Sequence, residues 1–162
     1  MYYNNYRKSC GNRLLNKRIP LSDQEIKEQY MVALQKLYEQ HDLGSILFLR
    51  IAAETGLRMR DIYDLKPSEI VVRKIHKKSL KTGKYENYPL ISEETEKIAE
   101  QLVGLQGRFF SRDYQYYITG IKRQFSDPNM KLLYILQYKR NKNRVECCAL
   151  ITNEKEMDIS IR

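Results

Sequence analysis

Residues 45–55, SILFLRIAAET, are apolar on nearly every side of a helix, and this stretch constrains the fold most. A helix with apolar residues all round must be covered by other elements, so it belongs in the centre of a core. Gly56 follows it and suits the left-handed position that ends many helices. We therefore expect a central buried helix with the rest of the chain packed around it.

Most other segments also show helical periodicity. Ser22, with Glu25 three residues later, is a capping-box pattern, and apolar residues then recur at helical spacing to about Glu39. A break at 41–44 separates this helix from the central one. Further helices are expected over 59–65, 92–105, 111–125 and 130–150, followed by a polar tail over 151–162.

The hydrophobic period changes in the middle of the chain. Residues 69–80 and 85–90 are typical of two strands, and the segment between them carries Gly83, a residue suited to a tight turn. The expected fold class is therefore mainly α with a small antiparallel β-hairpin or sheet.

Positive charge is segregated along the chain, whose formal net charge is +9. Residues 1–20, 73–84 and 131–144 carry five, six and five basic side chains and no acid. Because neutralised phosphates release counterions, clustered cations favour a polyanionic partner such as nucleic acid. A solvated lysine-rich surface is the alternative. We expect a basic N-terminal arm over 1–20 and a single domain over 21–162.

Several classes of site are not indicated. No apolar run approaches the roughly 20 residues that span a bilayer, and the basic N-terminal stretch lacks an apolar segment of signal-peptide length. The two histidines and three cysteines show no metal-ligand spacing, so we expect no metal, no cofactor and no membrane partner. The expected location is the cytoplasm or nucleoid, or the nucleus in a eukaryotic host or virus.

Two motifs follow one another at the centre of the chain, TGLRMRDIYDL over 55–65 and SLKTGKYENYPL over 79–90. Together they resemble the first arginine box and the β-hairpin lysine box of the tyrosine recombinase (phage integrase) family, a resemblance that spans about residues 22–146. It implies a recombinase catalytic-domain fold that binds double-stranded DNA. It also implies DNA recombination in a phage, virus or mobile element, with the chain itself or a related recombinase as a further partner.

The resemblance implies roles for three side chains. Arg58 would clamp the scissile phosphate, because its planar fork donates two parallel hydrogen bonds to phosphate oxygens. Asp61, one turn later, would orient Arg58, and Lys81 would protonate the leaving 5′ oxygen. Alternatively, Arg58 is a surface arginine after a helix end and Asp61 is an ordinary acid at a helix start. Lys81 is then one phosphate contact among several.

The later boxes of the family are degenerate in this chain. In the best register of the second box, Tyr134 replaces the first histidine and Gln137 replaces the second arginine, which removes a charge that phosphoryl transfer needs. The third box and its nucleophilic tyrosine are missing, which indicates a truncated C-terminal part. We therefore expect DNA binding without strand cleavage. The alternatives are an enzyme that uses Tyr134, Tyr138 or a tyrosine from a second chain, and an RNA-binding or protein-interaction module.

The expected DNA contacts are the arginine of the first box and the cations of the two later basic stretches. Helical geometry is expected to turn Lys139 and Arg140 to other faces than Gln137. The full set is Arg58, Arg73, Lys74, Lys77, Lys78, Lys81, Lys84, Lys139, Arg140, Lys142 and Arg144.

Overall fold

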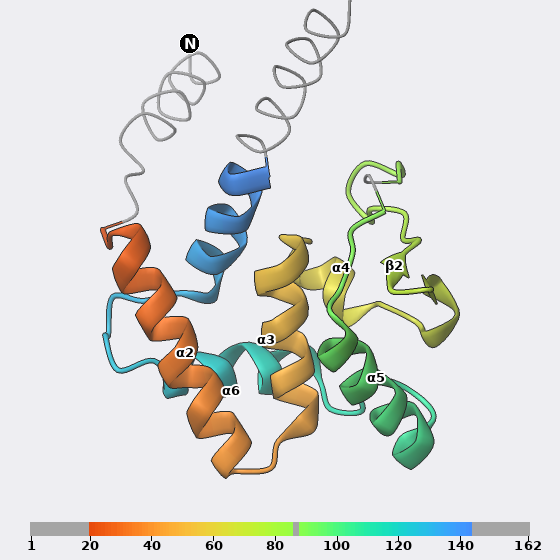
Figure 1. Ribbon diagram of the computed structural model, residues 1–162, viewed down its shortest axis with the longest axis horizontal. Helices are drawn as coiled ribbons and strands as arrows, with labels where there is room; N and C mark the ends of the chain where they lie inside the picture. The colour runs from red at the N-terminus through yellow and green to blue at the C-terminus, as the bar shows by residue number, and fades with distance from the viewer. Residues whose placement is uncertain (1–19, 86–87, 144–162) are drawn as a thin grey trace, which may run out of the picture.

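Helices make up most of the structure, a computed structural model that describes residues 20–85 and 88–143 (Figure 1). The coarse fold class is the expected one, mainly helical with a small two-stranded antiparallel sheet. Almost all of the expected N-terminal arm, together with Arg144 and the expected polar tail, lies outside the described residues. None of the described helices is long and apolar enough to cross a membrane.

The α3 helix (Leu43–Thr55) forms the centre of the fold, as its apolar sequence predicts. Most of its residues are buried, because helices on several sides cover it. Asp42 caps its start by accepting the backbone N–H of Ser45 at 3.2 Å. Gly56 ends it with a φ of 71°. The break before α3 therefore lies at His41 and Asp42, slightly earlier than the sequence indicates.

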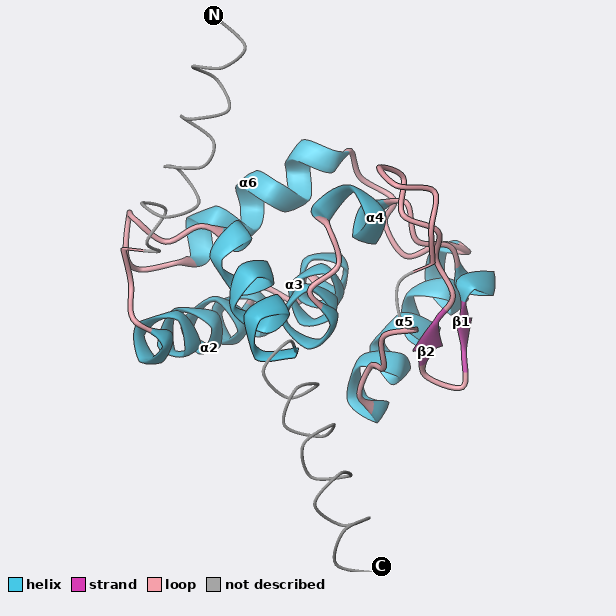
Figure 2. Ribbon diagram, turned by 90° about the horizontal axis from the view of Figure 1, so that it is seen from above, coloured by secondary structure: helices cyan, strands magenta, loops and turns pink. Residues whose placement is uncertain are grey.

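Three helices surround α3 (Figures 1 and 2). α2 (Asp23–Glu39) and α5 (Glu93–Gln106) each contact α3, and α6 (Tyr114–Gln124) contacts both α2 and α3. Each of the three begins at a side chain that accepts a backbone N–H of the first turn, which explains where the helices start. The capping residues are Ser22, Ser92 and Asp113.

Residues 132–143 form a last helical segment, drawn in blue in Figure 1. Leu132, Ile135 and Leu136 are buried in the same core as α3. The apolar first half of this segment thus anchors it to the fold. Its basic second half extends to the end of the described chain.

An aromatic cluster joins α3, α4 and α6. Phe48 of α3 stacks on Tyr117 of α6 with ring centroids 5.8 Å apart, and Phe110 meets both rings edge-on. Tyr63, the last residue of α4 (Met59–Tyr63), stacks against Phe110 at 6.3 Å. The ring contacts hold α4, and with it the turn before α4, against the core.

The sheet differs from the expected hairpin. β1 (Ile70–Val71) pairs antiparallel with β2 (Lys74–Ile75) at the edge of the fold opposite α2 (Figure 2). The turn between them consists of Val72 and Arg73, whose φ angles of 49° and 62° are left-handed. This conformation is unfavourable for a β-branched residue, so the sequence carries no turn signal there. The prediction of one strand over 69–80 is therefore wrong.

A second turn lies where the sequence predicts it, at Gly83, which has a φ of 68°. We call residues 74–85 and 88–90 the Gly83 hairpin. The left-handed φ is the conformation that glycine adopts without strain, which explains the residue at this place. Two isolated antiparallel bridges connect the sides of the hairpin, Lys74 with Leu90 and Lys78 with Tyr85.

Candidate nucleic-acid interface

Arg58 lies in the turn between α3 and α4, immediately before the first residue of α4. Its side chain is half-buried, and its Nη1 donates a hydrogen bond to Ser79 Oγ at 2.9 Å. Ser79 is buried at the base of the Gly83 hairpin. The two motifs, whose bonded residues are 21 positions apart in sequence, therefore meet at this guanidinium.

Asp61 binds the hairpin through the backbone. Its side chain is buried, and its Oδ1 accepts the backbone N–H of Leu80 at 2.9 Å. Its Oδ2 is also buried and has no hydrogen-bond partner among the described residues. Arg58 and Asp61 thus bind two consecutive residues, Ser79 and Leu80. The start of α4 holds the hairpin at two adjacent points.

Three lysines extend from the tip of the hairpin next to these contacts. Lys78, Lys81 and Lys84 are all exposed. The N–H of Gly83 donates to the carbonyl of Ser79 at 2.8 Å, which closes the tip. Lys81 lies two residues after the serine that binds Arg58. The structure therefore brings Arg58 and the segment that carries Lys81 together.

Lys77 differs from the expectation of a DNA-contacting lysine. Its side chain is only 6% exposed, and its Nζ lies 2.6 Å from Asp64 Oδ2 and 3.7 Å from Glu69 Oε2. Side chains alternate along an extended segment, so Lys77 points inward on the same side as Ile75 and Ser79. Two carboxylates neutralise the ammonium in the fold, and it cannot serve as a surface phosphate contact without breaking these pairs.

A second arginine, Arg140, lies beside the turn. Gln137, which the best register of the second box puts in the position of an arginine, is half-buried on the same helical segment. The Arg140 Nε donates to the carbonyl of Gly56 at 2.6 Å. A β-carbon on Gly56 would lie 3.1 Å from Arg140 Cγ and 3.4 Å from the carbonyl oxygen of Leu136. The helical segment docks on the turn through positions one helical turn apart, which places Arg140 next to the residues that precede Arg58.

The two tyrosines of the degenerate box lie elsewhere on the same segment. Tyr134 and Tyr138 are half-buried and pack against the core. The Nζ of Lys27, on α2, lies 5.8 Å from the centroid of the Tyr138 ring. Tyr138 therefore faces α2, on the side of the segment opposite Arg140.

The remaining expected contacts are spread over two places. Arg73 is half-buried in the turn between the strands, and Lys74 is exposed on β2. Lys139 is half-buried and Lys142 is exposed on the helical segment. Arg144 lies outside the described residues.

Figure 1 shows that the turn after α3, the Gly83 hairpin and the end of the helical segment lie at the same end of the molecule. All three segments carry cations, and the residue that links two of them is Arg58. We call this surface the basic face. Its residues are Arg58, Lys78, Lys81, Lys84, Lys139, Arg140 and Lys142.

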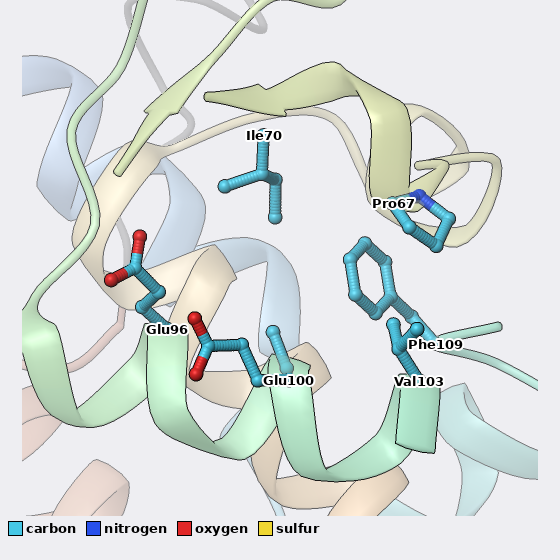
Figure 3. Close-up of a pocket in the computed structure, with 7 residues that line it drawn as sticks. Pro67, Ile70, Glu96, Glu100, Val103 and Phe109 are labelled. Atoms are coloured by element: carbon cyan, nitrogen blue, oxygen red, sulfur yellow. The ribbon is translucent and has the colours of Figure 1, made fainter. Parts of the chain in front are cut away.

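The character of a nearby pocket is opposite to that of the basic face. It lies between η1 (Pro67–Glu69), β1 and α5, and has a volume of about 250 Å³ (Figure 3). Ile70 and Phe109 contribute apolar walls, whereas Glu96 and Glu100 place carboxylates at its side. Negative charge there repels phosphates, so this pocket is not part of the proposed interface. Within the described ranges, no three potential metal-binding side chains come together.

Comparison of the chain with protein-family models, with curated proteins and with solved structures found no match. The functional assignment therefore depends on the two motifs and on the geometry that joins them.

Proposed function

We propose that this chain binds double-stranded DNA through the basic face. The observation that supports the proposal is the hydrogen bond from Arg58 to Ser79, which joins the first motif to the base of the lysine-bearing hairpin. Exposed lysines on the hairpin and on the helical segment lie on either side of this junction. Cations presented in this way neutralise several phosphates of one duplex, which provides affinity through counterion release.

The proposal includes a domain of the tyrosine recombinase type that does not cleave DNA. Domains of this type place two arginines and a lysine around a phosphate, and Arg58, Arg140 and Lys81 are residues of the same types. The location of Arg140 against the turn supports this reading, because it brings a second guanidinium to the turn that carries Arg58. Tyr138, however, faces α2. We therefore propose binding of duplex DNA without cleavage as the activity of the described part of the chain.

Fluorescence anisotropy with a labelled duplex tests the binding directly. Arg58→Ala should weaken binding, and the pair Lys78→Glu and Lys81→Glu should weaken it about tenfold or more, because two phosphate contacts become repulsive. The matched control is the pair Lys97→Glu and Lys122→Glu, on exposed positions of α5 and α6. It changes the net charge by the same amount and should leave affinity close to that of the parent.

Equal losses in the two charge-reversal pairs would show that net charge alone drives binding and would remove the basic face from the proposal. Tighter binding to an RNA duplex or single strand than to DNA would favour the RNA-binding alternative.

Covalent trapping on a nicked suicide duplex tests the cleavage alternative. We expect no protein–DNA adduct from the parent chain. An adduct that disappears in Tyr134→Phe or Tyr138→Phe would show that the chain is an enzyme with a displaced nucleophile.

A further inference from the structure

Exposed apolar side chains gather on β1, the Gly83 hairpin and the turn between them. Tyr85 and Tyr88 belong to this group and are 51% and 47% exposed, so about half of each side chain is in solvent. The other members of the group are Val71, Val72, Leu80 and Leu90.

The two tyrosines form one aromatic surface with their neighbours. Their ring centroids are 6.1 Å apart, and the ring of His76 lies 4.6 Å from that of Tyr88. The Nζ of Lys78 lies over the Tyr85 ring at 5.7 Å. We call Tyr85, Tyr88 and His76 the aromatic platform. A cation therefore already lies over one ring of the platform, near where the phosphate of a stacked nucleotide would need one.

The backbone of Tyr88 is also unusual, with a φ of 44°. Left-handed conformation costs a bulky residue free energy, and such strained positions occur preferentially where they serve binding. In the core, by contrast, the rings of Phe48, Phe110 and Tyr117 pack against each other away from solvent. The platform instead presents its rings to solvent.

The charge around the aromatic platform indicates the class of ligand that it binds. Residues 70–85 carry six basic side chains and no acid, and five of the six cations remain for a partner because two carboxylates outside this range neutralise Lys77. A basic or neutral partner gains nothing from this charge, whereas nucleic acid supplies both phosphates for the lysines and flat bases for the rings. Bases in a fully paired duplex are covered by their neighbours, so only unpaired bases can stack on an exposed ring.

We infer that the aromatic platform stacks unpaired bases, so that the preferred substrate is duplex DNA that carries an unpaired segment. This inference rests on the proposed duplex binding and narrows its substrate class. The lysines of the hairpin hold the backbone, and Tyr85 and Tyr88 hold bases that have left the stack.

The test compares three labelled duplexes of equal sequence outside the centre. One is fully paired, one has a short bulge of unpaired thymidines, and one has the same bulge built from abasic sites, which keep the phosphates and lack the bases. We expect the parent to bind the thymidine bulge at least about fivefold tighter than the abasic bulge, the lower end of what base stacking on an aromatic ring contributes.

Variants assign the preference to the rings. The pair Tyr85→Ala and Tyr88→Ala should bind both bulges equally, whereas the pair Tyr85→Phe and Tyr88→Phe keeps the rings and should keep the preference. Because both side chains are half-exposed, both pairs should fold, and circular dichroism checks this. Since phenylalanine preserves packing, it separates loss of stacking from loss of structure.

The outcomes distinguish the inference from the proposed function. Equal parent affinity for the two bulges, with normal binding to the paired duplex, overturns the inference alone. A preference that survives in the alanine pair overturns the assignment to these tyrosines. Absence of binding to all three duplexes overturns both the inference and the proposed function.

Discussion

At Gly56 the chain turns with a left-handed φ, and a β-carbon there would lie in tight contact with Arg140, 3.1 Å from its Cγ. The same arginine donates its Nε hydrogen to the carbonyl of Gly56. The turn that carries Arg58 is therefore held in its shape by the last helical segment, whose bonded arginine is 84 positions away in the sequence. A change at Gly56 acts on both the turn and its support.

Gly56→Ala should destabilise the fold by more than the about 1–2 kcal/mol that a left-handed alanine costs, because the new methyl group also crowds Arg140. The matched control is Gly107→Ala, at a φ of 75° with no atom within 4 Å of the added β-carbon, which should show the backbone cost alone. Urea denaturation measures both free energies of unfolding. Equal losses would show that the contact with Arg140 has no energetic weight.

Tyr30 provides a pH-dependent test at the scale of one residue. Burial on α2 raises its pKa from 10.0 to about 12, against the lowering effect of the nearby Arg50. The unfolded chain therefore releases this proton at lower pH than the folded chain does, so stability falls as pH rises from about 10 towards 12. The loss amounts to at most about 3 kcal/mol.

Tyr30→Phe removes this titration, and its free energy of unfolding should fall less steeply over the same pH window than that of the parent. Urea denaturation at several alkaline pH values measures the difference between the two slopes. Parallel curves for the two proteins would contradict the role of Tyr30.

Single residues show where sequence reasoning succeeds and where it stops. Arg58 and Lys81 could be singled out as candidate site residues because a glycine marks a turn close to each of them. Gly56 precedes Arg58, and Gly83 follows Lys81. The inward direction of Lys77 follows from its spacing of two residues from Ile75, which places both side chains on the same side of the extended segment. The neighbouring lysines made this pattern hard to see. Arg140 could not be placed, because helical spacing gives the faces of a segment and not the partner that each face meets.

Among the elements, α3 and α5 are joined by a network of polar side chains. Glu54 of α3 accepts the backbone N–H of Ser92 at 2.6 Å and the hydroxyl of Thr95, at the start of α5. Arg50, one turn earlier on α3, donates to the same Thr95 at 2.9 Å. A carboxylate at a helix start is favoured by the helix dipole as well as by these hydrogen bonds. The network fixes the end of α5 that follows the hairpin.

Glu54→Ala should lower the free energy of unfolding by about 2 kcal/mol, because it leaves half-buried donors on α5 without their acceptor. Glu94→Ala is the control. Its carboxylate also approaches Arg50, at 3.3 Å, but is 67% exposed, so its removal should cost less than about 1 kcal/mol. Equal effects in urea denaturation would show that the Glu54 contacts are no stronger than a surface ion pair.

At the same scale, the helices, the small antiparallel sheet and the turn at Gly83 were predictable, whereas the bounds of the strands were not. α2 and α5 begin at Ser22 and Ser92, where capping residues precede apolar residues at helical spacing. The central helix followed from its uniform hydrophobicity. The turn at Val72 and Arg73 could not be found, because neither residue prefers the left-handed conformation with which the chain connects β1 to β2.

For the whole molecule, charge distribution governs the expected behaviour. Cations gather on the basic face, whereas Glu96 and Glu100 line the pocket beside α5. Under the proposed function, a duplex would meet attraction at one end of the molecule and repulsion beside α5. The charge pattern alone shows only that the basic stretches are separate in the sequence. The expectation that they meet on one surface comes from the resemblance, and Figure 1 shows the hairpin and the last helical segment at the same end of the molecule.

The salt dependence of the DNA association constant should depend on the cations of the basic face. The logarithm of the parent association constant should fall linearly with the logarithm of salt concentration, and the pair Lys78→Ala and Lys81→Ala should reduce the slope by about two phosphate contacts. Lys97→Ala with Lys122→Ala, the matched pair on α5 and α6, should leave the slope unchanged. Anisotropy titrations over a salt series measure all three. An equal reduction in the two pairs would contradict a localised interface.

Lys77 and Lys78 are neighbours in sequence with opposite surroundings, one locked between carboxylates and the other open to water. An acylating or cross-linking reagent added to the folded chain will therefore modify the second amine readily and the first one slowly. The ratio of modification at Lys77 to modification at Lys78 thus measures the fraction of molecules that are folded. Labelling at position 77 marks molecules that have opened, while labelling at position 78 marks the surface that a ligand can shield.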